Sequence, residues 1–350
     1  MNRTPGGSKP KKEVTKQKTI SDKGIKNIIK KMLGNKGNQV KEGMTFLLSD
    51  GYKETTTVKE LFPFGILSMD IACGGGIPAS RITELYGDFS TGKTLAALHA
   101  IKEVQNLGGV GLYGDLEGSF SDHFIKILGI DPSRFIYIEP GTSIETFLTR
   151  THRFIENLPS HIPGMAVMDS VAGGFAKREE KRSYDTAEVA ARALAMGNIR
   201  RLTAPLARSR VALILINQIR KKFVTFGDDV DTVGGNVIKF QTSLRVWIKK
   251  VKQIKKGEKV IGMHGRIAVT KNRFAPPFRK ANIATLFSKG ILPYVGATDI
   301  LHRDGKLQKK AGWLQIVGTD IKFQKADIAK IIKQYPELLL PVSWQEKLKR

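Results

Sequence analysis

The chain has 350 residues, of which 41% are hydrophobic, so it is long enough to bury one large core together with a smaller module. It carries 58 Lys and Arg against 32 Asp and Glu, a formal net charge of +26, which predicts a polyanionic partner; nucleic acid is favoured over a membrane because no long apolar span is present. The lone Cys73 excludes an intramolecular disulfide and a cysteine-based metal cluster, and no signal peptide precedes the fold, so we expect a reducing, cytoplasmic setting.

The first 45 residues are predicted to lie outside the main core. Residues 1–20 combine basic side chains with Pro, Gly, Ser and Thr and contain almost nothing apolar to bury, which is typical of a disordered basic arm. From about residue 21 apolar residues recur at helical spacing, and the glycines at 34 and 37 end the pattern. This amphipathic helix either folds back on its own chain or docks on a neighbouring copy as a polymerisation helix.

A phosphate-binding loop is predicted between residues 87 and 94, where GDFSTGKT fits the pattern G-x-x-x-x-G-K-[ST]. The preceding run RITELY alternates as a strand does, and the following run LAALHAIKEV favours a helix, which is the setting of a nucleotide site. Lys93 can reach the terminal phosphates of ATP, and the Thr94 hydroxyl can bind Mg²⁺. The predicted nucleotide contacts in this segment are Gly87, Asp88, Phe89, Ser90, Thr91, Gly92, Lys93, Thr94 and Leu95.

Three further apolar runs also end in polar residues. GVGLYG leads to Asp115 and Glu117, MAVM leads to Asp169, and VALILI leads to Asn217 and Gln218. Helix-forming segments follow the runs, which predicts an α/β fold with a mostly parallel sheet covered by helices. The polar groups are therefore expected at the carboxyl edge of one sheet, where open α/β folds bind ligands. We assign residues 46–292 to this core.

These strand ends carry the groups that ATP hydrolysis needs. Asp169 can support Mg²⁺ and its waters beside Thr94, whereas the alternative role of helix N-cap could be filled equally well by Ser170. Glu117 can accept the proton of an attacking water. Gln218 cannot act as a base, but its amide can donate to a γ-phosphate, which makes it a candidate sensor.

Two segments that follow these strands, residues 172–186 and 219–235, are basic, aromatic and Gly-containing, with too few apolar residues for core elements. Long polar loops of this kind are functional or flexible. The second begins directly after Gln218, so a change at the γ-phosphate has a mechanical path to it. Cations in these loops can neutralise phosphates, and phenylalanines can pack against bases. The predicted DNA contacts are Lys177, Arg178, Lys181, Arg182, Arg220, Lys221, Lys222, Phe223, Phe226, Gly234, Gly235 and Asn236.

A pair of cations stands out in the later segment RIAVTKNRFAPPF. At the period of two of a strand, Lys271 and Arg273 point to one side and continue the face of Ile267 and Val269. Two cations at the end of a buried face need an anionic partner. That partner is either a set of internal carboxylates or the phosphates of an ATP held by an adjacent protomer.

Residues 293–350 are predicted to form a small α+β domain. The segment is short and basic, and it contains Trp313, Phe323 and an Ile-rich helix near residues 326–335. Neither internal repeats nor coiled-coil heptads occur in the sequence.

The order of these motifs resembles that of RecA-family recombinases over residues 21–336. The matching segments are GGGIPASRITELYGDFSTGKT, ALHAIKEVQNLGGV, DLEG, MDSVAG, LINQIRKKF, GGNVIKF, TKNRFAPPF and KKAGW. The resemblance implies a RecA-like ATPase core that assembles with ATP into a helical filament on single-stranded DNA, pairs it with homologous double-stranded DNA and exchanges strands. It also implies that Glu117 is the hydrolytic base and Gln218 the γ-phosphate sensor, that Lys271 and Arg273 act across a subunit interface, and that Phe124 stacks on adenine.

The sequence departs from the family pattern at several positions. Leu95 replaces a hydroxyl residue that commonly follows the phosphate-loop Lys-Thr, and Ser121 stands where an acidic adenine contact is usual, so relaxed base selectivity is expected. The usual acidic tail is replaced by Lys347, Lys349 and Arg350, which argues against autoinhibition through that tail. A divergent chain with a basic arm would suit a bacteriophage or another mobile element.

Two other function classes share part of this pattern. A hexameric replicative helicase has the same ATPase core but normally needs a primase-binding domain, for which this chain has no room. A passive single-stranded DNA-binding protein would explain the charge, but it would not explain Lys93, Glu117 and Gln218 together.

Overall fold

The computed structural model describes residue 58 and residues 60–179, 189–221 and 230–339. Contacts divide the chain after Thr57, and all described residues belong to the second unit, Val58–Arg350. The predicted arm and helix of residues 1–45 lie outside the described residues. The same is true of five predicted DNA contacts, Lys181, Arg182, Lys222, Phe223 and Phe226.

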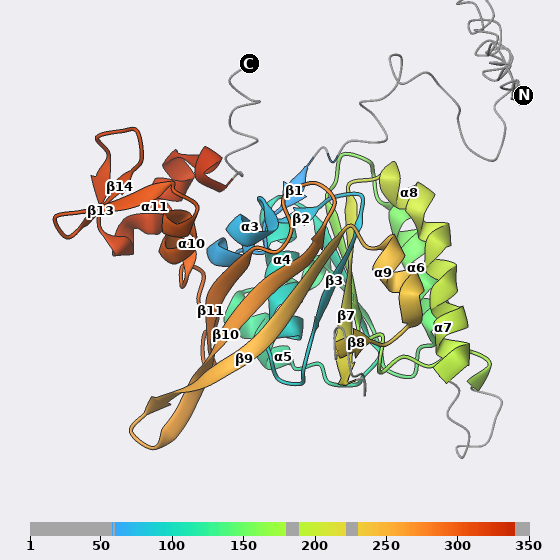
Figure 1. Ribbon diagram of the computed structural model, residues 1–350. Helices are drawn as coiled ribbons and strands as arrows, with labels where there is room; N and C mark the ends of the chain where they lie inside the picture. The colour runs from blue at the N-terminus through green and yellow to red at the C-terminus, as the bar shows by residue number, and fades with distance from the viewer. Residues whose placement is uncertain (1–57, 59, 180–188, 222–229, 340–350) are drawn as a thin grey trace, which may run out of the picture. The chain divides into compact units, whose positions relative to one another are not determined.

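One large sheet lies at the centre of the described structure (Figure 1). Its parallel strands are β3 (Ile82–Gly87), β4 (Val110–Asp115), β5 (Phe135–Ile138), β6 (Gly164–Asp169), β7 (Val211–Lys221) and β9 (Leu244–Lys256). The antiparallel strands are β8 (Val230–Thr232), β10 (Lys259–Asn272), β11 (Lys280–Leu286) and β12 (Gly290–Ile291). Within the described residues the order is β12-β11-β10-β9-β3-β7-β6-β4-β5, with β8 beside β7. The four predicted apolar runs are β3, β4, β6 and β7, so their parallel arrangement is confirmed.

Helices cover both faces of the parallel strands. They are α3 (Leu67–Cys73), α4 (Lys93–Asn106), α5 (Asp122–Leu128), α6 (Ile144–Asn157), α7 (Val189–Gly197), α8 (Thr203–Ala207) and α9 (Gly235–Gln241), with 3-10 turns at Pro132–Arg134 and Asn198–Leu202. On β6, Met165 and Val167 share a buried cluster with α4, whereas Ala166 and Met168 share another with α6 and α7. A strand buried on both faces has a continuous apolar sequence, which explains why these strands were predictable. None of the helices in the described ranges combines the length and apolar character of a membrane span.

β9 and β10 form an antiparallel hairpin whose closed end extends past the other strands in Figure 1. The sequence does not predict the length of this hairpin. The outer half of β9 is exposed and rich in lysine, so it lacks the apolar alternation that marks a half-buried strand. A separate short pair, β1 (Leu61–Phe62) and β2 (Ile77–Pro78), lies outside the sheet.

The prediction of a single loop over residues 219–235 is wrong at both ends. β7 continues past Gln218 to Lys221 and pairs with β8, and α9 begins at Gly235. Arg220 lies opposite Asp231 in this short ladder. β7 and β8 form hydrogen bonds between their main-chain groups, and a polar composition does not predict such pairing. Residues 222–229 lie outside the described residues.

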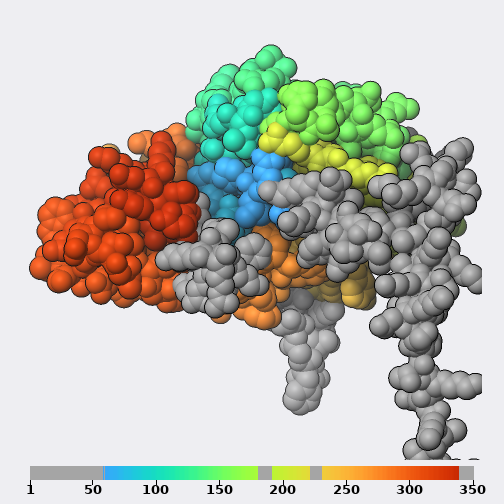
Figure 2. Space-filling model, turned by 90° about the horizontal axis from the view of Figure 1, so that it is seen from above, coloured from blue at the N-terminus to red at the C-terminus, as the bar shows by residue number. Residues whose placement is uncertain are grey.

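The C-terminal part of the described chain is a small α+β arrangement, as predicted. Its elements are α10 (Ala297–Arg303), β13 (Leu307–Lys310), β14 (Trp313–Ile316), β15 (Lys322–Phe323) and α11 (Ile328–Gln334), with 3-10 turns at Lys325–Asp327 and Pro336–Leu339. The three strands form an antiparallel sheet, and α10 packs on α3. Figure 2 shows this part, in red, beside the blue surface of the first described residues. The domain boundaries at residues 45 and 292 stay predictions.

Candidate active site

The phosphate loop joins β3 to α4. Gly92 caps α4 with a φ of 93°, a left-handed conformation that glycine adopts without strain. A Cβ at Gly87 would lie 2.1 Å from the carbonyl oxygen of Ile248, so the approach of β9 requires glycine there. The Lys93 ammonium lies inside the loop, where it donates to the carbonyl oxygens of Gly87 at 3.1 Å and Asp88 at 2.6 Å.

Lys93 is a desolvated cation surrounded by acids. Burial lowers its pKa, and the carboxylates of Asp169, Glu117 and Asp88 oppose that shift. Its hydrogen-bond partners are the main-chain carbonyls of the loop that a polyphosphate would enter. The ammonium can therefore exchange these carbonyls for phosphate oxygens with little movement of the main chain.

Asp169, at the end of β6, links this strand to α4 and to β4. Its Oδ2 accepts hydrogen bonds from the hydroxyls of Thr94 and Tyr113, each at 2.6 Å. Burial raises the pKa of Asp169, and the two hydroxyl donors act against this rise. Tyr113 was not among the predicted site residues, because a tyrosine inside an apolar strand run has no distinguishing pattern.

Thr94 and Asp169 fit the ligand set of a nucleotide-bound Mg²⁺. This ion usually keeps several waters and binds one or two protein oxygens together with substrate phosphates. Among the described residues no group of three or more His, Cys, Asp or Glu side chains could hold a metal ion by itself. One hydroxyl and one carboxylate beside the phosphate loop therefore suit a metal that arrives with its nucleotide.

Glu117 is exposed just after β4 and is held between Ser170, directly after β6, and Gln218 on β7. Its Oε2 accepts a hydrogen bond from the Ser170 hydroxyl at 2.9 Å, and its Oε1 accepts one from the Gln218 amide at 3.1 Å. The turn that carries Glu117 is fixed by Asp115, whose carboxylate accepts hydrogen bonds from two main-chain amides and the Tyr137 hydroxyl. Asp115 therefore has a structural role, whereas the exposed Glu117 carboxylate can face a ligand.

A cavity of about 490 Å³ opens beside the phosphate loop, a volume that suits a nucleotide-sized ligand. It is lined by Ser90, Thr91, Gly92, Lys93, Thr94, Leu95, His123, Phe124, Met263, Thr285, Leu286 and Phe287. Phe124 thus shares a cavity with the loop. The contributions of β10 and β11 were not predicted, because they are distant in sequence and follow no local motif.

Comparison with known proteins agrees with this geometry. The RecA N-terminal domain family matches residues 27–292. Protein RecA of Trichormus variabilis is 33% identical over 292 residues, which is 83% of this chain and 80% of that protein. The chain belongs to the RecA family. Protein RecA of Thioalkalivibrio sulfidiphilus is 34% identical over 322 residues, 91% of this chain and 92% of that protein. A crystal structure of the RadB recombinase aligns with a TM-score of 0.48 at 22% identity, covering 66% of this chain and 98% of that chain.

The predicted cationic fingers of this RecA-family chain lie at the end of α9. Lys271 Nζ donates to the carbonyl oxygen of Lys239 at 2.5 Å, and Arg273 Nη2 donates to that of Phe240 at 2.8 Å. In the described structure these side chains therefore bind main-chain carbonyls, which does not favour the alternative of internal carboxylate partners. Phe240 itself is 68% exposed.

The prediction that Lys271 continues the face of Ile267 and Val269 is wrong. A register shift between Val269 and Lys271 sets Val269 opposite Val246 but Lys271 opposite Arg245. Adjacent strand residues face opposite sides, so Lys271 lies on the face of Arg245 and not on that of Ile267 and Val269. The extra residue is Thr270, and a bulge of this kind has no reliable sequence pattern.

The helices that follow the two predicted DNA segments lie side by side. α7 follows the first segment, α9 follows the second, and these helices pack against each other. Lys177 and Arg178 are exposed before α7, and Arg220 is exposed on β7. Gly234 caps α9, so Gly235 and Asn236 form its first turn.

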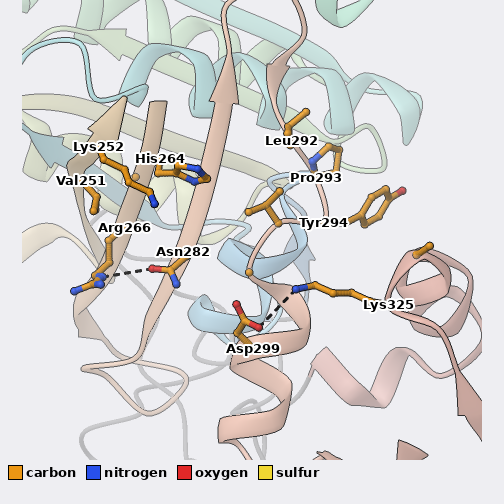
Figure 3. A pocket seen from close by; sticks show the side chains of 14 residues that line it. Val251, Lys252, His264, Arg266, Asn282, Leu292, Pro293, Tyr294, Asp299 and Lys325 are labelled. Atoms are coloured by element: carbon orange, nitrogen blue, oxygen red, sulfur yellow. Dashed lines mark hydrogen bonds and ion pairs between the residues drawn. The ribbon is translucent and has the colours of Figure 1, made fainter. Parts of the chain in front are cut away.

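A second, larger cavity of about 700 Å³ does not include the phosphate loop (Figure 3). It lies between β9, β10 and β11 on one side and residues 292–299 with Lys325 on the other. Its charged lining residues are Lys252, Arg266, Lys325 and Asp299, together with His264. Asp299 lies 3.9 Å from Lys325, which leaves an excess of positive charge near Lys252 and Arg266.

Proposed function

We propose that this chain is an ATP-dependent recombinase that assembles as a helical filament on single-stranded DNA, pairs it with a homologous duplex and exchanges strands. The observation that carries the proposal is the hydrogen bond from Gln218 to Glu117. Gln218 belongs to β7, and the same strand continues to Arg220 and Lys221. One rigid element thus joins the proposed hydrolytic carboxylate to a basic segment, which is the connection that a DNA-dependent ATPase requires.

Each site residue has a role in this proposal. Lys93 binds the terminal phosphates, and Thr94 and Asp169 would hold Mg²⁺ and its waters, which would neutralise charge on the phosphates. Glu117 takes the proton of the attacking water, and the Ser170 hydroxyl orients it. Gln218 donates to the γ-phosphate and returns to Glu117 after hydrolysis. Phe124 stacks on the base.

The lining of the 490 Å³ cavity supports relaxed base selectivity. Outside the phosphate loop its lining residues are mainly apolar or aromatic and include Phe124, Met263, Leu286 and Phe287. A pocket that offers stacking surfaces and few hydrogen-bond partners rejects related bases weakly.

The duplex partner is supported by the 700 Å³ cavity and its excess of cations. Replacing Lys252 and Arg266 by alanine should weaken duplex binding at all sequences. For each phosphate that the variant no longer neutralises, the slope of log affinity against log salt should fall by about 0.9. Titrations at several salt concentrations measure this slope. Arg153→Ala, an exposed position on α6, removes one positive charge as a control and should leave the slope unchanged.

The Lys271 charge should make assembly sensitive to alkaline pH. Burial, then the neighbouring Arg273 and Arg245, lower the pKa of Lys271 to about 8. As the pH rises through this value the free chain loses the Lys271 charge, so ATP-dependent assembly should slow in wild type and stay level in Lys271→Arg, which remains charged. Light scattering after ATP addition from pH 7 to 9 measures this. Parallel profiles of the two proteins would contradict the assignment.

Electron microscopy with single-stranded DNA and a non-hydrolysable ATP analogue tests the proposed function. A long helical filament is expected. A closed ring would favour a hexameric helicase, and an irregular coating that forms without nucleotide would favour a passive single-stranded DNA-binding protein.

A further inference from the structure

The segment that leaves β6 toward the first predicted DNA loop is firmly fastened to the core. We call residues 170–179 the stem. Its middle is held by the start of α6, where the Ile144 amide donates to the Phe175 carbonyl at 2.9 Å and the Glu145 carboxylate accepts from the Lys177 amide at 3.1 Å. The stem therefore presents Lys177 and Arg178 from a defined position.

The beginning of the stem touches the proposed hydrolytic carboxylate. The Ser170 hydroxyl donates to Glu117 at 2.9 Å and accepts from the Gly173 amide at 3.1 Å. A Cβ at Gly173 would lie 2.9 Å from the Glu117 Cβ and 3.0 Å from its Cα, so these two chain segments are in direct contact. A change in the position or charge of Glu117 must therefore be accommodated by Ser170 and Gly173.

The far end of the stem is closed by an ion pair. Arg192, in the first turns of α7, donates through Nε and Nη2 to the carboxylate of Glu179, with each contact at 3.2 Å. The Glu179 side chain is 12% exposed and that of Arg192 28%. Arg192 Nη1 also donates to the Ala172 carbonyl at 3.4 Å, so one guanidinium contacts both ends of the stem. Fork-shaped pairing of this kind fixes geometry as well as charge.

We propose that Glu179 and Arg192 form a clasp that keeps the stem pressed against Glu117, so that the nucleotide site acts on the first basic segment as well as on the segment after Gln218. Neither residue lines the nucleotide cavity, so both are positioning residues. In the sequence, Glu179 and Arg192 stand on either side of residues 180–191, which include Lys181 and Arg182. This inference rests on the proposed function, because it assumes that the basic segments meet DNA.

Glu179→Gln in the full chain tests the clasp. Nucleotide affinity and the DNA-independent ATPase rate should stay near wild type. The stimulation by single-stranded DNA should fall by about 2- to 30-fold, the range expected when coupling between two sites is altered. Glu156→Gln removes the same charge from a side chain on α6 that is 58% exposed, and it should leave stimulation unchanged. The exchanged pair Glu179→Arg with Arg192→Glu should recover part of the loss.

Hydrogen exchange provides a readout that does not depend on activity. A non-hydrolysable ATP analogue, without DNA, should change the exchange of residues 171–177 in wild type and have less effect on them in Glu179→Gln. If Glu179→Gln destabilises the chain, Arg192→Lys keeps the charge but loses the fork, and it should show the same reduced response.

Three results would overturn the clasp. Normal DNA stimulation in Glu179→Gln is the first. The second is a normal exchange response in that variant. The third is a loss confined to Arg192 variants with no recovery in the exchanged pair, which would mean that Arg192 meets DNA directly. A wild-type chain that DNA does not stimulate would refute the proposed function instead, and the exchange measurement would still test the clasp.

Discussion

Glu117→Gln is expected to lower ATP turnover by about 10²- to 10⁴-fold, the usual effect of losing one positioned general base. The amide has the shape of the carboxylate, so it can still accept from Gln218 and bond to the Ser170 hydroxyl. It cannot take a proton from water at neutral pH. Binding of ATP and of single-stranded DNA should therefore remain, and filaments of the variant should persist after ATP is added.

Two comparisons separate this effect from a general loss of charge or of binding. Glu139→Gln removes one exposed carboxylate near the end of β5 and should hydrolyse ATP normally. Lys93→Ala should lose ATP binding itself, because the phosphate loop would lack its buried cation. Steady-state hydrolysis and nucleotide binding, both measured with and without DNA, distinguish the three proteins. Near-normal DNA-stimulated turnover in Glu117→Gln would remove Glu117 as the base.

The sequence predicts the parallel core well because residues that are close together in the sequence determine each of its strands and the phosphate loop. β6 is buried along its whole length, so it forms a continuous apolar run that ends at Asp169, whereas β3 is recognised by its alternation before the phosphate loop. The phosphate loop is equally visible, since Gly87 and Gly92 are required by a close main-chain approach and a left-handed turn. Placing Asp169, Glu117 and Gln218 at one edge then follows from parallel order alone.

The missed features depend on pairing between distant segments. The lysines of β9 give no apolar alternation, so the long hairpin is not visible in the sequence. Met263 and Phe287 line the nucleotide cavity only because β10 and β11 join the sheet beside β9. The bulge at Thr270 reverses the facing of Lys271 through one extra residue. Such contacts are set by register, which a short sequence pattern does not specify.

Removing both cationic fingers is expected to abolish ATP-dependent assembly while leaving ATP binding intact. Lys271 and Arg273 donate to carbonyl oxygens at the end of α9. In the sheet register Lys271 lies opposite Arg245 of β9, and Arg245 lies opposite Glu84 of β3, a position before the phosphate loop begins at Gly87. We therefore expect them to meet the ATP of a neighbouring copy. A γ-phosphate can join two subunits only while cations of the second subunit compensate its charge. Lys271→Ala with Arg273→Ala should then bind ATP but neither assemble nor turn it over.

Mixing this double variant with Lys93→Ala protein tests whether the fingers act in trans. Each protein alone should be inactive. A mixed interface can combine an intact phosphate loop from the double variant with intact fingers from the Lys93→Ala chain, so DNA-dependent hydrolysis should recover in part at intermediate ratios. A mixture of Lys93→Ala with Glu117→Gln is the matched control, since its mixed interfaces supply fingers to an intact loop that lacks the base, and it should recover little. If the first pair assembles together and no ratio restores hydrolysis, the fingers act within their own chain, because a site completed across the interface would have to work in that mixture.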